Sequence, residues 1–449
     1  MKDVFQYIND HADEFVARLQ RLCQQPSIAA QNIGMEATAE LVADMLRGVG
    51  AEARLVPTEG YPVVFGQIEG PPDSRVLGFY NHYDVQPPEP LDLWKSEPFG
   101  AEIRDGHIYA RGVADNKGNF CARVCAVEAY RAIKGDLPLG VKFIVEGEEE
   151  IGSVSLKGFV RENRDLVMCD GLIWESGYKN HSGRLVISLG LKGILYIELR
   201  VRGANTDLHS ANAAVVPSPV WRLVWALNLL KDADERVLIP GFYDDVRAPS
   251  EADLALLEAM PADEAARLAT LGLDQFVLGL SGLPLKEKHL FQPTCNICGF
   301  GAGYTGEGLK TVLPNEAMCK IDFRLVLDQD PFKILDSLRA YLDARGFDDI
   351  EIVTLDADWA QRTDPDDPIV KATAAAAAKV YEQPPVVSPT MAGSGPGHTL
   401  CGELGIPSAG AGTGYHGSKS HAPNENIRVV DYIEGIKHIA ALLDEFACV

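Results

Sequence analysis

The chain has 449 residues, too many for one compact core, which predicts two domains or one domain with a large insertion. Apolar residues make up 46% and charged residues 23%, values typical of globular proteins rather than disordered chains. The formal net charge of −23 repels phosphate backbones and anionic lipid surfaces, so neither nucleic acid nor a membrane is expected as a partner.

The N-terminal stretch alternates acidic and apolar residues at helical spacing, which predicts an amphipathic helix from Phe5 to Cys23 and no signal peptide. No segment reaches the roughly 18 apolar residues of a membrane span. The nine cysteines are odd in number and follow no framework pattern, which indicates reduced thiols. Cys295 and Cys298 form a single CxxC, a weak indication of metal binding or redox chemistry. These features predict a cytoplasmic protein.

A second amphipathic helix is predicted from Met35 to Val49, followed by apolar strands at 76–85 and 140–147. Between these strands, residues 116–135 carry apolar side chains at helical intervals and end in a glycine, as a helix stop does. Helices and strands that alternate in this way predict an α/β fold whose sheet is covered by helices on both faces. Functional groups in such a sheet gather where its strands end.

The pattern changes near Gly190. Alternating strands are predicted at 191–203 and 317–328, and each is followed by a helical segment, at 218–232 and 330–346. The acidic helical stretch at 250–282 indicates solvated helices without chemistry. Near Asp358 the pattern of the first part returns. We therefore expect a first domain formed by residues 1–189 and 358–449, interrupted by a smaller inserted domain at 190–357.

The segment "NHYDVQP" follows an apolar run. His82 and Asp84 are two residues apart, so their side chains point the same way on an extended segment. A metal-bound imidazole usually has a carboxylate or carbonyl on its other nitrogen, and Asp84 can supply one. The alternative is a hydrogen-bonded polar histidine at a strand end.

In "YARGVADNKGN", Asp115 lies just before the predicted helix. Taken alone it is an N-cap, because aspartate is common at that position. The functional alternative is a carboxylate that bridges two metal ions.

The segment "VKFIVEGEEEIGS" ends a buried-looking strand in four acids, Glu146, Glu148, Glu149 and Glu150. Unpaired buried carboxylates cost several kcal/mol each, so cations are expected nearby. Few basic residues occur in the neighbouring stretches, which favours a divalent metal.

Further candidates follow two other stretches: Asp170 and Glu175 in "CDGLIWESG", and His416 and His421 in "YHGSKSHAPNENI". Two histidines with three carboxylates suit a mixed nitrogen and oxygen site for zinc or a similar ion. Two metals that share one carboxylate would use all five.

These segments resemble the M20 metallopeptidases, the two-zinc hydrolases that include carnosinase-like dipeptidases, glutamate carboxypeptidases, acetylornithine deacetylase and succinyl-diaminopimelate desuccinylase. The resemblance covers nearly the whole chain. It implies an α/β fold in which a mixed-sheet zinc-hydrolase catalytic domain is interrupted by a smaller α+β lid and dimerisation domain, and hence a homodimer. Its landmarks are "NHYDVQP", "YARGVADNKG", "EGEEEIGS", "TDLHSA", "FRLVLDQDP" and "SHAPNE".

The resemblance also implies two Zn²⁺ per subunit, with Co²⁺ or Mn²⁺ tolerated by the same donors. Glu149 would be the general base, with Asp84 behind His82, while Glu146 and Glu148 would only add negative charge. Because carnosinase-like members use aspartate as the third carboxylate, Asp170 is an alternative to Glu175. The peptide bond after Asp115 is expected to be cis. The implied ligands are His82, Asp115 and Glu175 for one ion, and Asp115, Glu150 and His421 for the other.

Outside the metal ligands, the resemblance implies that His209 in "TDLHSA" reaches the active site of the partner subunit and stabilises an oxyanion; a surface histidine is the alternative. Arg324 and Asn296 match positions that grip the carboxylate or carbonyl of the substrate, and the planar fork of arginine suits a carboxylate. Backbone donors at Gly393, Ser394 and Gly395 are expected to add to this grip.

The resulting prediction is a metal-dependent hydrolase that cleaves an amide or peptide bond in a small substrate with a free carboxylate. A dipeptidase or carboxypeptidase is the first choice, and an N-acyl amino acid deacylase of the acetylornithine or succinyl-diaminopimelate type is the alternative. Arg324 does not separate them, since both substrates carry a carboxylate. A non-catalytic metal-binding member would lack a ligand or the base. A phosphoesterase is disfavoured by the acidic composition and the absence of a glycine-rich phosphate loop.

Overall fold

A computed structural model describes all 449 residues, and its largest sheet has six strands in the order β1-β2-β6-β3-β7-β19. Strands β3, β6, β7 and β19 run parallel, whereas β2 pairs antiparallel with both β1 and β6. The sheet is therefore mixed, as expected. The bounds are Glu52–Val56 for β1, Val63–Ile68 for β2, Val76–His82 for β3, Gly140–Glu146 for β6, Gly171–Trp174 for β7 and Ser408–Gly410 for β19.

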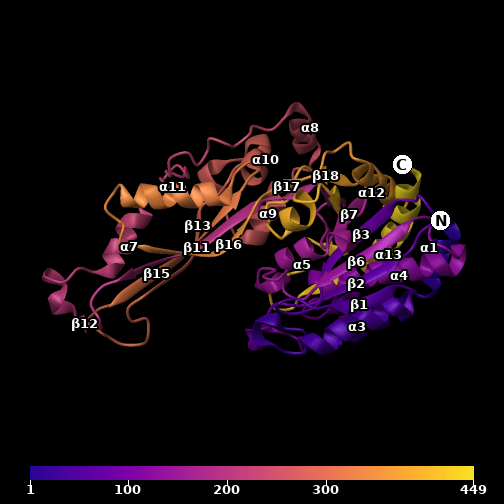
Figure 1. Ribbon diagram of the computed structural model, residues 1–449, viewed down its shortest axis with the longest axis horizontal. Coiled ribbons are helices and arrows are strands. Elements are labelled where there is room, and N and C mark those ends of the chain that lie inside the picture. The colour runs from indigo at the N-terminus through magenta and orange to yellow at the C-terminus, as the bar shows by residue number, and fades with distance from the viewer.

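Helices cover both faces of this sheet (Figure 1). The largest apolar core lies on one face, and a smaller core beneath two short helices lies on the other. The first face is covered by α1 (Lys2–Asp10), α2 (Ala12–Gln24), α3 (Met35–Gly48), α4 (Gly118–Lys134), α12 (Pro368–Ala378) and α13 (Val429–Cys448), and the second by α5 (Leu156–Glu162) and α6 (Arg164–Val167).

The first predicted helix is in fact two helices, α1 and α2, which are separated at His11. The imidazole of His11 stacks on Tyr7 and lies 2.9 Å from the Tyr7 carbonyl oxygen through Nδ1. This local contact of side chain with backbone competes with the helical hydrogen bonding that the apolar periodicity favours.

Two smaller sheets border the six-stranded sheet, in the orders β18-β9-β8-β20 and β21-β5-β4. They join the start of the chain to its end, because β21 pairs with β5, and β18 and β20 pair with β9 and β8. Their bounds are Glu102–Arg104 for β4, His107–Tyr109 for β5, Tyr178–Lys179 for β8, Leu185–Ser188 for β9, Val386–Ser388 for β18, Gly414–Tyr415 for β20 and Asn426–Arg428 for β21.

The middle of the chain forms a second unit, a four-stranded antiparallel sheet in the order β13-β15-β11-β16. One face packs on α7 (Pro219–Leu227) and α11 (Pro331–Asp343) around a separate apolar core, while polar side chains line much of the open face. Figure 1 shows this unit extending away from the six-stranded sheet. Its strands are β11 (Gly193–Arg202), β13 (Asn296–Ala302), β15 (Glu316–Leu325) and β16 (Glu351–Asp358).

The chain passes between the two units where β10 (Gly190–Leu191) pairs antiparallel with β17 (Gln361–Arg362). The chain enters and leaves the insert here side by side. We propose the boundaries expected from the sequence, 1–189, 190–357 and 358–449, because the apolar cores separate on either side of this short ladder.

The acidic stretch forms α8 (Glu251–Ala259), α9 (Glu264–Leu271) and α10 (Gly282–Phe291), which lie over the junction (Figure 1). Lys192 Nζ donates hydrogen bonds to the carbonyl oxygens of His289 and Gln292 at the end of α10. None of the helices is long and apolar enough to cross a membrane. All nine cysteines are free, including Cys295, which is buried, and Cys298, which is exposed.

Candidate metal centre

Three parallel strands bring acidic and imidazole side chains to one edge of the six-stranded sheet. His82 ends β3 and pairs with Glu146 at the end of β6, and Glu175 directly follows β7. Since the carboxyl ends of parallel strands meet at the same edge, residues separated by nearly a hundred positions come together there. The structure thus has the clustering of functional side chains at strand ends that was expected.

Asp115 lies between the two histidines. Its Oδ1 atom is 3.0 Å from His82 Nε2, and its Oδ2 atom is 3.2 Å from His421 Nε2. Asp115 belongs to the short helical turn η3 (Val113–Lys117) before α4, and the bond to Asn116 is cis, as expected. Each oxygen of this carboxylate thus faces a different imidazole, which is the arrangement that a bridging ligand requires.

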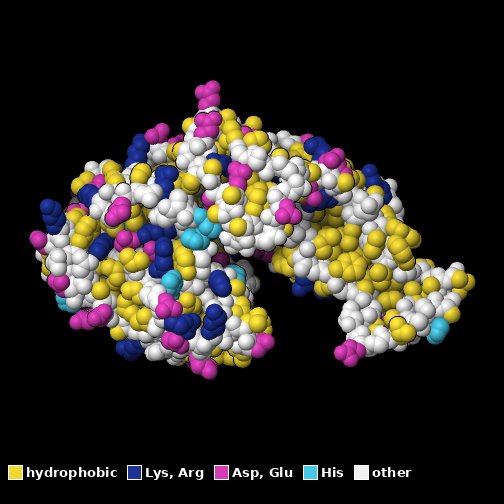
Figure 2. All heavy atoms as spheres, turned by 180° about the vertical axis from the view of Figure 1, so that it is seen from behind, with side chains coloured by type: hydrophobic (Ala, Val, Ile, Leu, Met, Phe, Trp, Pro, Cys, Tyr) yellow, Lys and Arg dark blue, Asp and Glu magenta, His cyan; other side chains and the backbone are white.

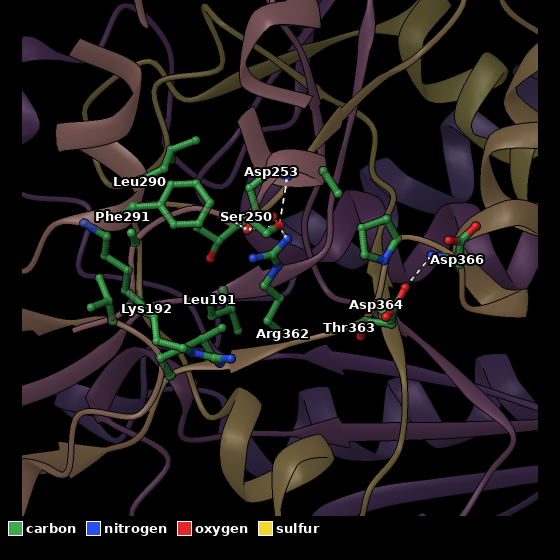
Figure 3. A pocket seen from close by; sticks show the side chains of 18 residues that line it. Leu191, Lys192, Ser250, Asp253, Leu290, Phe291, Arg362, Thr363, Asp364 and Asp366 are labelled. Carbon is green, nitrogen blue, oxygen red and sulfur yellow. Dashed lines mark hydrogen bonds and ion pairs between the residues drawn. The ribbon is translucent and has the colours of Figure 1, made fainter. Parts of the chain in front are cut away.

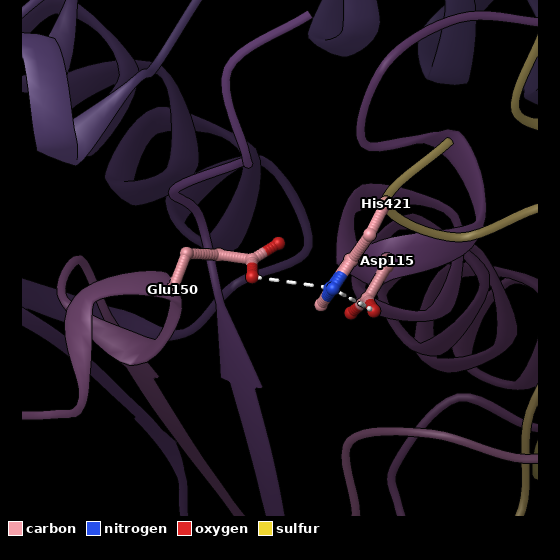
Figure 4. A group of neighbouring side chains, drawn as sticks. All are labelled: Asp115, Glu150 and His421. Carbon is pink, nitrogen blue, oxygen red and sulfur yellow. Dashed lines mark ion pairs between the residues drawn. The ribbon is translucent and has the colours of Figure 1, made fainter. Parts of the chain in front are cut away.

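Glu150 approaches His421 from the other side (Figure 4). Its Oε2 atom is 3.2 Å from His421 Nε2 and accepts a hydrogen bond of 2.9 Å from Gln86 Nε2. Ligand atoms of Asp115, Glu150 and His421 all lie within 4.8 Å of one another. These three side chains can therefore hold one ion.

The two candidates for the remaining carboxylate lie at opposite ends of β7. Glu175 Oε2 is 3.6 Å from His82 Nε2. Asp170 precedes the strand, and its Oδ2 atom accepts a hydrogen bond from the Val76 amide. Only Glu175 lies beside the other candidate ligands.

Asp84 lies behind His82 as expected, with the carboxylate Oδ1 atom 3.3 Å from His82 Nδ1 and the backbone oxygen 3.0 Å from the same nitrogen. The Oδ2 atom accepts a hydrogen bond from the Glu150 amide. Asp84 therefore orients two of the candidate ligands at once, the role that outer carboxylates play around metal sites.

The charged groups of the centre shift one another's pKa values. Burial acts to lower the pKa of His82, but its contacts with Asp115 and Asp84 outweigh burial and raise that pKa well above its ordinary value. Contacts with Asp115 and Glu150 raise the pKa of His421 to about 10. Burial acts to raise the pKa of Asp115, but the two histidines lower it below its ordinary value.

Glu149 opens the turn η4 (Glu149–Ile151), next to Glu150. Burial and then the Glu175 carboxylate raise the pKa of Glu149 well above its ordinary value. A β-carbon on Gly395 would lie 3.9 Å from Glu149 Oε1, so Glu149 lies next to the glycine-rich loop. A carboxyl group that is not a candidate ligand is therefore placed beside the candidate ligands.

The donors at this centre fit divalent metal. Glu150 Oε1 and Glu175 Oε2 are buried and have no hydrogen-bond partner, although a buried carboxylate oxygen normally has one. Two imidazoles and three carboxylates form the mixed set that zinc, cobalt and manganese accept. Metal ions would satisfy the oxygens that the protein leaves without partners.

The role expected for Glu146 and Glu148 is wrong, because each has specific partners. Glu146 accepts hydrogen bonds from the Tyr80 hydroxyl and the Ser153 hydroxyl. Glu148 accepts from the backbone amides of Tyr61 and Ser155. These two acids hold the loops around the centre rather than only adding negative charge.

Sequence reasoning missed Glu425, a fully buried carboxylate in the "SHAPNE" segment. It accepts hydrogen bonds from Arg111 Nη1 and from the backbone amides of Gly112, Ala114 and Asp115. Glu425 therefore fixes the turn that carries Asp115. The only sequence signal for Glu425 was its position as an acidic residue at the end of a motif that supplies a candidate ligand.

Arg123 was also missed. It is buried in α4 and donates hydrogen bonds to the backbone oxygens of Tyr80 and Trp174 and to Asn81 Oδ1. Those partners lie at the ends of β3 and β7, so Arg123 fixes the spacing of the strands that carry His82 and Glu175.

Two of the residues predicted to bind substrate lie on the other side of the junction. Asn296 and Arg324 lie on the open face of the four-stranded sheet, on β13 and β15. The loop of Gly393 and Ser394 reaches the junction, because Ser394 Oγ donates to the Gly193 oxygen and Gly393 accepts from the Lys192 amide. This loop connects the centre to the insert.

His209 lies far from the centre of its own chain. It ends β12 (Leu208–His209), at the outer end of the insert (Figure 1). The side chain is exposed, and Nδ1 accepts a hydrogen bond from the Ala211 amide, which leaves Nε2 free. The structure does not bring His209 to the ligands within one chain.

A cavity of about 640 Å³ lies at the junction, separate from the centre (Figure 3). Lys192, Leu290, Phe291 and Thr363 are among the residues that line it. Inside it, Arg362 of β17 forms an ion pair with Asp253 of α8. This pair ties the helices of the insert to the strand that leads back to the six-stranded sheet.

The α/β fold and the cluster of imidazoles and carboxylates at its sheet edge define a metal-dependent hydrolase. The sequence profile of peptidase family M20/M25/M40 matches residues 78–445. The chain belongs to this family and is an M20 metallopeptidase.

The chain is 30% identical over 375 residues to the Beta-Ala-His dipeptidase of Rattus norvegicus, which covers 77% of the chain and 74% of that relative. It is 27% identical over 342 residues to a Cys-Gly metallodipeptidase of Schizosaccharomyces pombe, covering 72% and 71%. Among solved structures, an M20 family metallo-carboxypeptidase from Sulfolobus solfataricus, Sso-CP2, superposes with a TM-score of 0.93 at 39% identity, covering 97% of this chain and 100% of the other.

Proposed function

We propose that this enzyme hydrolyses the peptide bond of small peptides with a free carboxylate, most of all dipeptides, with two divalent metal ions per subunit. The observation that carries the proposal is the convergence of His82, Asp115, Glu150, Glu175 and His421 beside Glu149. Relatives that are named dipeptidases favour this substrate class over N-acyl amino acids.

In this proposal His82, Asp115 and Glu175 hold one ion, and Asp115, Glu150 and His421 hold the other. Bound divalent ions supply an activated water and polarise the scissile carbonyl. Glu149 accepts the proton of the attacking water and returns it to the leaving amine. Zinc is the proposed ion, and the mixed donor set also accommodates cobalt or manganese.

The remaining groups act on the substrate. Arg324 binds the substrate carboxylate through its guanidinium fork, with Asn296 beside it. Backbone groups of the glycine-rich loop, at Gly393, Ser394 and Gly395, contact the substrate from the metal side. His209 of the partner subunit donates a hydrogen bond to the developing oxyanion.

A substrate panel tests this function. Free dipeptides, including β-alanyl-histidine and cysteinyl-glycine, are compared with their C-terminal amides and with N-acetyl and N-succinyl amino acids, on enzyme loaded with Zn²⁺, Mn²⁺ or Co²⁺. We expect kcat/KM for the best free dipeptide to exceed that for N-acyl amino acids by about 100-fold. A site that hydrogen-bonds a polar group of its substrate discriminates against an analogue without that group, because a polar group of the site is then left unpaired. Faster hydrolysis of N-acyl amino acids would make the enzyme a deacylase.

The proposed enzyme is a homodimer that pairs through the insert. Trp221 and Trp225 stack on the outer side of α7 and are 59% and 55% exposed. Ile297 and Phe300 on the edge strand β13 are also exposed, and Figure 2 shows hydrophobic side chains gathered over the insert. Exposed apolar groups of this extent mark protein interfaces.

Placing charges on α7 should separate the subunits. We expect the double variant Trp221→Glu, Trp225→Glu to sediment as a monomer and to lose most of its activity, because His209 then has no partner active site to enter. Leu271→Glu, an equally exposed apolar position on α9, serves as the control and should leave the mass unchanged. A wild-type monomer in analytical ultracentrifugation would contradict the homodimer.

We also propose that the enzyme works in the cytoplasm without a nucleic acid or membrane partner. The nine free cysteines and the net charge of −23 support this placement.

A further inference from the structure

A buried carboxylate on the open face of the insert joins the two side chains proposed to bind substrate. Asp322 on β15 is 7% exposed. Its Oδ1 atom accepts hydrogen bonds from Asn296 Nδ2 and from the Cys298 thiol, each 2.9 Å long, and its Oδ2 atom accepts one of 3.1 Å from Arg324 Nε. Both oxygens of Asp322 are therefore engaged by donors from β13 and β15.

Strand register produces this contact. Asn296 lies opposite Asp322 in the β13–β15 ladder, and Arg324 lies two residues further along β15 on the same face. A shift in register between Ile297 and Gly299 displaces β13 locally. Cys298 consequently also reaches Asp322.

This cluster lies beside the junction with the metal centre. Leu325, next to Arg324, pairs with Gly193, whose carbonyl oxygen accepts the hydrogen bond of Ser394. The loop that contains Ser394 continues to Gly395, which faces Glu149. These contacts place the loop between Glu149 and Arg324, and the proposed substrate would extend along it from one to the other.

Asp322 determines which atoms its neighbours present. An ionised carboxylate only accepts hydrogen bonds, so Asn296 must turn its NH₂ group to Asp322 and its Oδ1 atom away. Arg324 uses Nε on Asp322, while Nη1 and Nη2 make no hydrogen bond within the protein. The cluster thus offers one acceptor oxygen next to a fork of two charged donors.

We propose that Asp322 is a positioning residue that holds Asn296 and Arg324 in this pattern and so selects substrates whose free carboxylate lies beside an N–H donor. This inference rests on the proposed function. It assigns the carboxylate to Arg324 alone and an N–H group of the substrate to Asn296, which differs from the carboxylate or carbonyl expected for Asn296 from the sequence.

The variant Asp322→Asn separates positioning from charge. If Asp322 only neutralised Arg324, removal of its charge would strengthen the binding of a carboxylate, and KM would fall. If it positions Arg324, the fork is released and KM for a free dipeptide rises by about tenfold or more, as the loss of hydrogen bonds to charged groups implies. We expect KM to rise and kcat to change by less than about threefold. The preference of the variant for the free dipeptide over its amide should also be smaller than that of the wild type.

Asp356→Asn is the matched control. Asp356 lies on the same face, opposite Tyr196 in the β11–β16 ladder; its charge interacts with Arg324, but it makes no side-chain hydrogen bond to Asn296 or Arg324. Asp356→Asn removes the same charge near Arg324 without removing a hydrogen bond to it, so its KM should equal that of the wild type or fall slightly. Bound metal and the melting temperature are measured for each variant, so that a folding defect in Asp322→Asn is visible directly.

A double-mutant cycle with Arg324→Lys gives the second readout, because lysine lacks the fork. We expect Asp322→Asn to add little to Arg324→Lys. A fall in KM, equal effects of Asp322→Asn and Asp356→Asn, or full additivity in the cycle would overturn the positioning role. The proposed function has its own readout: it fails if the wild type itself shows no preference for free dipeptides.

Discussion

Replacing Glu149 with glutamine should lower kcat for dipeptide hydrolysis by about 10³-fold while the bound metal remains, because the amide cannot take the proton of the attacking water. The side chain keeps its shape, and no candidate ligand is removed. Initial-rate assays of dipeptide cleavage measure kcat, and mass spectrometry of the same preparation measures the bound metal.

The control for this experiment is Glu162→Gln, which removes one carboxylate from the exposed end of α5. It should leave both kcat and metal content at the wild-type level. If Glu149→Gln retains more than about a tenth of wild-type kcat, another group transfers the proton.

Replacing Asp115 with alanine should have an equally large effect through the metal itself. Because its two oxygens face His82 and His421 separately, removal of this one side chain takes a ligand from both proposed ions. We expect most of the bound divalent metal to be lost and kcat/KM to fall by about 10³-fold or more. Metal content per chain after dialysis and activity after readdition of Zn²⁺ are the measurements.

Asp170→Ala provides the comparison, since Asp170 was the sequence alternative for a ligand and instead accepts a hydrogen bond from the Val76 amide at the start of β3. It should keep its metal. Loss of metal from Asp170→Ala together with retention in Glu175→Ala would reverse the proposed assignment.

The sequence predicted the mixed α/β architecture well, because buried parallel strands are continuous apolar runs, and the alternating strands of the middle segment underlie the proposed boundaries at 190–357. The break at His11 escaped prediction, since it depends on one local contact with Tyr7 that apolar periodicity does not register. The acidic stretch was expected to be solvated, yet Asp253 and the carbonyl of His289 make buried contacts at the junction.

At the centre, the ligand motifs could be recognised because their residue types are unusual at strand ends. The residues that hold those ligands in place could not be recognised from the sequence. Glu425 contacts the turn of Asp115 across 310 residues of sequence, and Arg123 joins two strands through backbone oxygens, which carry no sequence signal. Asp322 directly precedes the motif "FRLVLDQDP", but its role depends on a ladder register that only the folded sheet defines.

The short ladder of β10 and β17 has a mechanical consequence. A rotation of the insert about this ladder acts like a lever on a pivot, and displacement grows with distance from it. Arg324 lies next to the pivot, through the pairing of Leu325 with Gly193, whereas β12 lies at the far tip. Swinging would therefore carry His209 through a wide arc while the guanidinium of Arg324 stays almost in place, so the two groups could be positioned independently in the proposed dimer.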